Sequence, residues 1–187
     1  MKVALENAPW YPGKVTEDAK AGISLLNGVW REATLEFHAI RALRQRNGGT
    51  EPKGVQKFLN QSIDSRFEEA GWDGSDGRFR RGSTWMRVTF RHQMSLGSDF
   101  LDALWLSRKE GVSQCLILAA PLEFLKIITP NDAGALTSYE KVMQKVALLN
   151  GIYDVPLILG CLTPQSEVST TILEGLTGAR PRGRSSR

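Results

Sequence analysis

Residues 112–121 constrain the fold of this chain more than any other stretch. Leu116, Ile117 and Leu118 follow one another without a polar residue between them. Side chains alternate between the two faces of a strand, so a strand with this sequence must be covered on both faces. Residues 155–162 form a second apolar run of the same kind, with a proline near its start, where a strand tolerates one. Both runs predict buried strands in a sheet.

Residues 84–92 have the alternating pattern of a strand with two different faces. Met86 and Val88 fall on one face, and Trp85 and Arg87 fall on the other. The first face predicts core, whereas the second is cationic. A cationic face needs an anion over it, either from a bound partner or from carboxylates elsewhere in the fold.

The remaining segments of this half of the chain set the order of elements. We expect a strand at 98–106, a hairpin turn at 108–111 and a helix at 136–149. The resulting order is strand, strand, strand, helix, strand. This order predicts an α/β fold with a mixed central β-sheet flanked by helices.

The N-terminal half predicts mainly helix. Residues 1–15 look irregular, and residues 16–48 carry an apolar stripe at helical spacing, which serves either as packing scaffold or as a dimer seam. A second helix is expected from about residue 52 to residue 70, followed by a mobile loop at 73–81. We expect one domain over 1–175, with a weak last helix at 164–175, and a disordered basic tail at 176–187.

Composition limits the class of protein. The chain has 187 residues, of which 41% are hydrophobic and 24% are charged, as in an ordinary soluble domain. No run reaches the roughly 18 apolar residues that span a bilayer, and the N-terminus lacks the apolar segment of a signal peptide. We therefore expect no membrane association and a cytoplasmic location. Cys115 and Cys161 lie in apolar runs without zinc-ligand spacing and are expected to act as small hydrophobes.

Positive charge is unevenly distributed along the sequence. Residues 77–98 contain five arginines and no acidic residue, and residues 176–187 contain four arginines and no acidic residue. Such patches are typical of proteins that bind a phosphate backbone, although a solvated face gives the same pattern. The arginines predicted to contact nucleic acid are Arg78, Arg80, Arg81, Arg87 and Arg91.

Carboxylates that follow this arginine run are the candidates for chemistry. In a strand at 98–106, Asp99 and Asp102 would point to opposite faces, so only one of them is expected in a site. Glu123 and Lys126 place a carboxylate and an ammonium just after the central strand. On spacing alone, these groups are as compatible with surface ion pairs as with catalysis.

Several short segments together resemble the BamHI and BglII type of restriction endonuclease. The resemblance covers about residues 20–165 and consists of pattern and order. It implies a nuclease-like mixed sheet, dimers that straddle palindromic DNA, and hydrolysis of a phosphodiester by water with magnesium. The segments that carry it are Ala70-Gly71-Trp72, Ser98-Asp99-Phe100, Glu123-Phe124 and residues 150–155.

The resemblance also implies a metal site. Magnesium takes oxygen ligands, so at least two carboxylates should converge. Asp99 corresponds to the first metal-binding aspartate, and Glu123 corresponds to the second member of a Glu-x-Glu or Glu-x-Gln pair. The position of the first member is Pro121, which cannot bind a metal. Either Glu140 supplies the missing ligand from the following helix, or Glu123 is itself the second ligand and Lys126 orients the water.

Two function classes therefore remain open. The first is a Mg²⁺-dependent endonuclease that cleaves double-stranded DNA in restriction or defence, which the order of Asp99 and Glu123 favours. The second is a catalytically inactive nuclease-fold subunit that binds DNA within a larger assembly, which the sequence Ala119-Ala120-Pro121 favours. In both cases the expected partners are double-stranded DNA and a second copy or another subunit. A weaker alternative is a structural protein whose basic regions meet acidic proteins.

Overall fold

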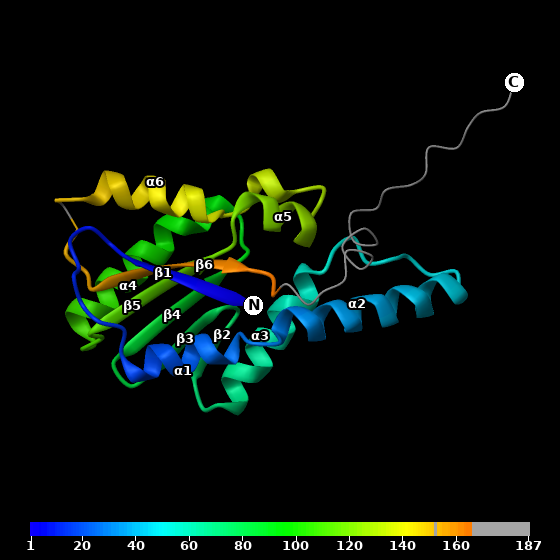
Figure 1. Ribbon diagram of the computed structural model, residues 1–187, viewed down its shortest axis with the longest axis horizontal. Helices are drawn as coiled ribbons and strands as arrows, with labels where there is room; N and C mark the ends of the chain where they lie inside the picture. The colour runs from blue at the N-terminus through cyan, green and yellow to red at the C-terminus, as the bar shows by residue number, and fades with distance from the viewer. Residues whose placement is uncertain (152, 166–187) are drawn as a thin grey trace, which may run out of the picture.

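One six-stranded mixed sheet organises the part of the chain that the computed structural model describes, residues 1–151 and 153–165. The strand order is β1-β6-β5-β4-β3-β2, as Figure 1 shows. Strands β4, β5 and β6 are parallel to one another. The remaining pairings are antiparallel: β1 with β6, β3 with β4, and β2 with β3. The strands are β1 (Lys2–Asn7), β2 (Asp73–Ser75), β3 (Arg78–Arg81), β4 (Thr84–Thr89), β5 (Gln114–Ala119) and β6 (Leu157–Thr163).

Helices cover both faces of the sheet. One core packs α1, α2, α3 and α5 against it, and a second core on the opposite face packs α4 and α6. The predicted α/β class, a mixed central sheet flanked by helices, is confirmed. The helices are α1 (Glu17–Leu25), α2 (Val29–Arg46), α3 (Gln56–Glu69), α4 (Leu96–Lys109), α5 (Leu122–Ile128) and α6 (Tyr139–Leu149), with short 3₁₀ turns η1 (Gln93–Ser95) and η2 (Ala133–Ala135).

The two apolar runs are strands of the sheet interior, β5 and β6, as predicted. Every residue of β5 is buried, because Leu116 and Leu118 face one core while Cys115 and Ile117 face the other. Strand β4 is also fully buried. Its predicted alternation is correct, but its cationic face is covered by α4 and is not open to solvent.

The predicted strand at 98–106 is wrong, because this segment lies in helix α4. Its buried residues are Leu96, Asp99, Phe100 and Ala103, which have helical spacing. Asp99 therefore counts as an inward position, although it is polar. The helix connects β4 to β5 as a crossover between parallel strands, and so there is no hairpin at 108–111.

The N-terminal half differs from the prediction in three places. Residues 2–7 form the edge strand β1 instead of an irregular segment. The long helix is broken into α1 and α2 at Gly28, whose φ of 79° lies in the left-handed region. The loop predicted at 73–81 contains the β2–β3 hairpin, whose two-residue turn Asp76-Gly77 has positive φ at both positions.

Two further observations bear on the expectations from sequence. In the described part of the chain, no helix has the length and apolar character needed to cross a membrane. Most of the expected last helix and all of the expected basic tail lie outside the described residues.

Candidate functional site

The centre of the predicted site is a buried ion pair between strand β4 and helix α4. Arg87 Nε lies 3.1 Å from Asp99 Oδ1, and both side chains are fully buried. Arg78 lies directly opposite Arg87 in the β3–β4 register, and its Nη2 lies 3.2 Å from the same Asp99 oxygen. Arg78 also lies 3.1 Å from Asp102, one helical turn further along α4. Two guanidinium groups therefore converge on one buried carboxylate.

This arrangement replaces the predicted orientation of the two aspartates. A helix places residues three apart on one side, so Asp99 and Asp102 share a face and a partner in Arg78. Burial lowers the pKa of Arg87, whereas Asp99 raises it and the neighbouring Arg78 lowers it again. The pair contributes charge balance inside the protein and fixes α4 on the sheet.

Asp99 does not fit the role of magnesium ligand. A cation at its carboxylate would have to displace guanidinium groups and lie beside two positive charges, which repel it. Within residues 1–151 and 153–165, no three His, Cys, Asp or Glu side chains are grouped so that they could hold a metal ion. The structure therefore does not assemble Asp99, Glu123 and Glu140 into a metal site, and we derive no step that uses one.

Glu123 and Lys126 form a solvated pair on helix α5. Lys126 Nζ lies 2.6 Å from Glu123 Oε1, and the Glu123 side chain is 81% exposed. Residues three apart on an exposed helix often form such pairs, which contribute little stability. Both residues are on a helix and not at the end of the central strand, because Pro121 ends the strand and begins α5.

Glu140 does approach this helix. Its carboxylate accepts hydrogen bonds from the Leu122 backbone N–H at 3.2 and 3.3 Å, so it satisfies a free amide at the start of α5. Burial raises the pKa of Glu140, but hydrogen bonds from Ser138 and from the backbone N–H groups of Glu140 and Leu122 outweigh it, and the pKa is lowered. Glu140 thus contacts the first turn of α5, which also carries Glu123, and Lys126 of the last turn pairs with Glu123, whereas Asp99 is bound to the arginines of the sheet.

The other predicted DNA-contacting arginines are also paired with carboxylates. Arg81 Nε lies 3.3 Å from Asp18 of α1, and Arg91 pairs with Asp76 of the β2–β3 turn. Arg80 pairs with Glu110 at the end of α4 and donates to its carbonyl oxygen. The prediction that Arg87 contacts phosphate does not agree with its complete burial. Arg80, Arg81 and Arg91 each have a carboxylate partner in the fold and remain partly exposed, so their contact with DNA stays a prediction.

The Asp76-Gly77 turn is a junction that the sequence reasoning missed. The Gly77 N–H donates to Asp64 of α3 at 3.1 Å, and Arg87 Nη1 donates to the Asp76 carbonyl oxygen at 2.6 Å. A side chain at Gly77 would meet the Val88 carbonyl oxygen at 2.2 Å. The Asp-Gly dipeptide, a strong signal for a two-residue hairpin turn, was the available clue.

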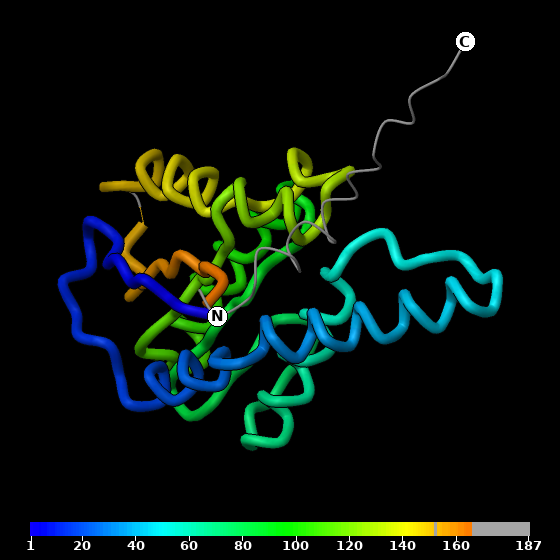
Figure 2. Tube along the Cα trace, turned by 45° about the vertical axis from the view of Figure 1, so that its right-hand side comes forward, coloured from blue at the N-terminus to red at the C-terminus, as the bar shows by residue number. Residues whose placement is uncertain are grey.

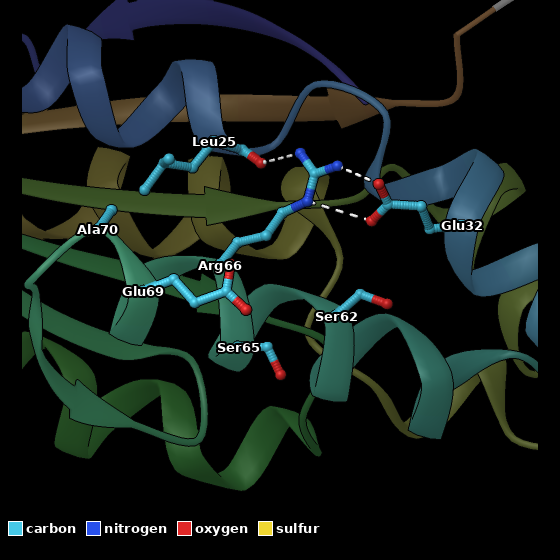
Figure 3. A pocket seen from close by; sticks show the side chains of 7 residues that line it. All are labelled: Leu25, Glu32, Ser62, Ser65, Arg66, Glu69 and Ala70. Carbon is cyan, nitrogen blue, oxygen red and sulfur yellow. Dashed lines mark hydrogen bonds and ion pairs between the residues drawn. The ribbon is translucent and has the colours of Figure 1, made fainter.

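A second polar site lies where α1, α2 and α3 meet. Figure 3 shows Arg66 of α3 reaching across a surface hollow to Glu32 of α2 and to the Leu25 carbonyl oxygen. Arg66 Nε lies 3.1 Å from Glu32, and its Nη1 lies 3.0 Å from the Leu25 oxygen. The guanidinium also donates to the Asn27 carbonyl oxygen, so its donors are used within the protein. Arg66 therefore fixes the corner between α1 and α2 at Gly28.

Comparisons with known proteins support the fold. No protein-family model matches the sequence, and no curated protein matches it. Among solved structures, the chain is similar to restriction endonuclease BglII in a crystal structure with a DNA 16-mer. The TM-score is 0.54 with 15% sequence identity, and the match covers 90% of this chain and 81% of that chain. At this identity the likeness establishes architecture alone. The chain has a restriction-endonuclease-like fold, distantly similar to that of BglII.

Proposed function

We propose that this protein binds DNA through a nuclease-like fold and does not hydrolyse DNA at Asp99. The observation that supports this proposal is the buried Arg87–Asp99 ion pair, with Arg78 as a second cation on the same carboxylate. Asp99, which the sequence offered as a metal ligand, is instead neutralised by Arg87 and Arg78. A protein that keeps the fold without this site fits the class of inactive DNA-binding subunits.

Metal-dependent hydrolysis of double-stranded DNA is the alternative. It is favoured by two carboxylates at the first turn of α5, Glu123 on the helix and Glu140 on the Leu122 amide, because carboxylates are the ligands that magnesium takes. In this alternative, Glu140 and Glu123 would supply metal ligands and Lys126 would orient the water. Asp99 would keep its structural role.

One experiment separates the two functions. The purified protein is incubated with mixed-sequence duplex DNA and magnesium, manganese or chelator, and cleavage and gel shift are scored in the same samples. We expect a shift without cleavage under every metal condition. Cleavage that is lost both with chelator and in Glu140→Gln would establish the alternative, and Glu17→Gln, an exposed carboxylate on α1, is the matched control.

We further propose that two copies associate through the groove between α4 and α6. Met94, Leu101 and Leu148 are large apolar side chains that line this groove, and each is more than half exposed. Trp105, which is also more than half exposed, lines a neighbouring hollow on α4 together with Leu101. Exposed apolar side chains gathered on one surface are typical of a protein contact, and a two-fold interface places the same patch of both copies together.

Light scattering tests this association. Leu101→Lys is expected to convert the dimer to monomer, because it places a charge in the apolar contact. Leu35→Lys changes a similarly exposed leucine on α2 and should leave the dimer intact. A wild-type protein that is monomeric at all concentrations, or a dimer that survives Leu101→Lys, would contradict the proposed interface.

A further inference from the structure

Residues 38–57 form a projection that the predicted arginine patch did not include, and we call it the basic arm. Helix α2 runs out from the sheet layer, and the chain returns along it to α3 (Figures 1 and 2). Phe37 is the last buried residue of α2, and the next buried residue in the chain is Val55. Apart from Val55 at its end and Ile40, which packs partly against the core, the basic arm lies outside both cores.

The basic arm keeps its shape through contacts within itself. Arg41 Nε lies 2.8 Å from Glu51, and Gln45 Nε2 donates to the same carboxylate at 3.1 Å. Arg44 Nη1 donates to the Thr50 carbonyl oxygen at 2.8 Å, and the Gly49 N–H donates to the Arg44 carbonyl oxygen at 2.8 Å. These bonds hold the returning segment against the helix, so the arm is an ordered projection whose outer surface faces solvent.

Charge on the basic arm is not balanced. Its only carboxylate is Glu51, which pairs with Arg41. In the described residues, no carboxylate forms an ion pair with the other four cations, in contrast to the arginines of β3 and β4. These four cations are Arg44, Arg46, Lys53 and Lys57.

Unbalanced cations on an exposed helix match the chemistry of a nucleic-acid backbone. The part of α2 beyond Ile40, from Arg41 to Arg46, is about 9 Å long, and an α-helix with its side chains is about as wide as the DNA major groove. Leu43, which is 54% exposed on the same part of the helix, adds an apolar group that can contact bases or sugars. An acidic protein surface would satisfy the same cations, and the test below distinguishes it from duplex DNA.

We propose that the basic arm is the element that contacts duplex DNA, with Arg44, Arg46, Lys53 and Lys57 on phosphates. This inference rests on the proposed DNA-binding function and names the surface that performs it. Arg66 supports the basic arm, because it fixes the corner from which α2 starts and so sets the direction of the arm. The arginines of β3 and β4 support the fold beneath it.

The test measures duplex DNA affinity as a function of salt for three proteins. These are the wild type, the arm variant Arg44→Ala/Arg46→Ala and the control variant Lys2→Ala/Lys20→Ala. The control removes the same amount of positive charge, but from strand β1 and helix α1, where both lysines are exposed. Each lost phosphate contact lowers the slope of log affinity against log salt by about 0.9. We expect the arm variant to lose about 1.8 in slope and at least about tenfold in affinity at low salt. The control should keep both.

Each outcome decides a different claim. Equal affinity and slope for the wild type and the arm variant would overturn the arm proposal while DNA binding stands. If the wild type shows no duplex binding, the proposed function and the arm proposal both fail. Binding to polyglutamate but not to duplex, with loss in the arm variant, would reassign the arm to acidic protein partners. Thermal unfolding of each variant checks that it folds, and Arg44→Lys/Arg46→Lys should restore most of the affinity.

Discussion

The arginines of β3 and β4 and the cations of the basic arm are similar in sequence but have different surroundings. The first group lies in a stretch without acidic residues, yet each of its arginines pairs with a carboxylate from elsewhere in the fold. The basic arm contains Glu51 within its sequence, yet most of its cations face solvent. Local charge density therefore does not identify a binding surface, because distant carboxylates decide which cations remain available.

The largest expected effect breaks the Arg87–Asp99 pair. Asp99→Ala leaves a buried guanidinium without its carboxylate, and we expect the free energy of unfolding to fall by about 3–5 kcal/mol. Urea unfolding measures the loss. Asp102→Ala, on the same helix but 42% exposed, is the control and should cost no more than about 1 kcal/mol. Equal small losses in both variants would mean that the inner arginines do not depend on Asp99.

The next effect concerns the base of the arm. Arg66→Ala removes the hydrogen bonds that fix the α1–α2 corner, and we expect a loss of about 1–2 kcal/mol of unfolding free energy. If the arm binds DNA, affinity falls as well, because the arm loses its fixed direction. Arg108→Ala, which removes an exposed ion pair with Asp154, is the matched control and should change neither quantity measurably.

A smaller effect on stability depends on pH and concerns Glu140, a carboxylate whose partner is a backbone N–H and not an arginine. The folded-state pKa of Glu140 is lowered, so its stabilising contribution is present above its ordinary pKa of 4.5 and is lost as pH falls through the folded value. Glu140→Gln should cost at most about 1 kcal/mol near neutral pH. The difference in unfolding free energy between Glu140→Gln and the wild type, measured by urea unfolding at a series of pH values, should shrink toward zero in acid. A difference that grows in acid would contradict this assignment.

The smallest expected effect tests the comparison directly. Arg80→Ala and Arg81→Ala remove cations already paired with Glu110 and Asp18, so we expect duplex DNA affinity to change by no more than about twofold. Gel shift or fluorescence anisotropy against the wild type measures this change. Losses of affinity as large as those of the arm variant would mean that the DNA-binding surface lies on β3 and β4, as the sequence predicted.

Much of the fold could be predicted because apolar pattern determines it. The uninterrupted run around Leu116–Leu118 and the run at 155–162 predicted the interior strands β5 and β6. Helix α4 was mistaken for a strand because the exposed Leu101 and Trp105 add apolar residues outside the buried set, which hides the helical spacing of that set. Strand β1 has almost no buried residues and so carries no apolar signal.

The candidate site was less predictable than the fold, because its partners are distant in sequence. Nothing near Arg81 or Arg80 indicates that Asp18 and Glu110 will neutralise them. The Asp76-Gly77 turn was readable from its residue types and would have converted the predicted loop into a hairpin. Strand β3 of that hairpin pairs next with β4, which places Arg78 opposite Arg87, and from there the acidic partner on α4 could have been sought.

The pairing of β1 with β6 has a consequence for how the chain reaches this structure. Lys2 pairs with Thr163, so the edge strand cannot add to the sheet until almost the whole described chain is available. Closing so long a loop is entropically costly, and contacts of this kind form slowly. During synthesis β1 therefore stays unpaired until β6 has been made. Strand β6 is the last strand of the described chain to be made, and it must insert between β1 and β5. Until then, β5 presents an unpaired apolar edge, and we expect this interval to be when the growing chain is most prone to aggregate.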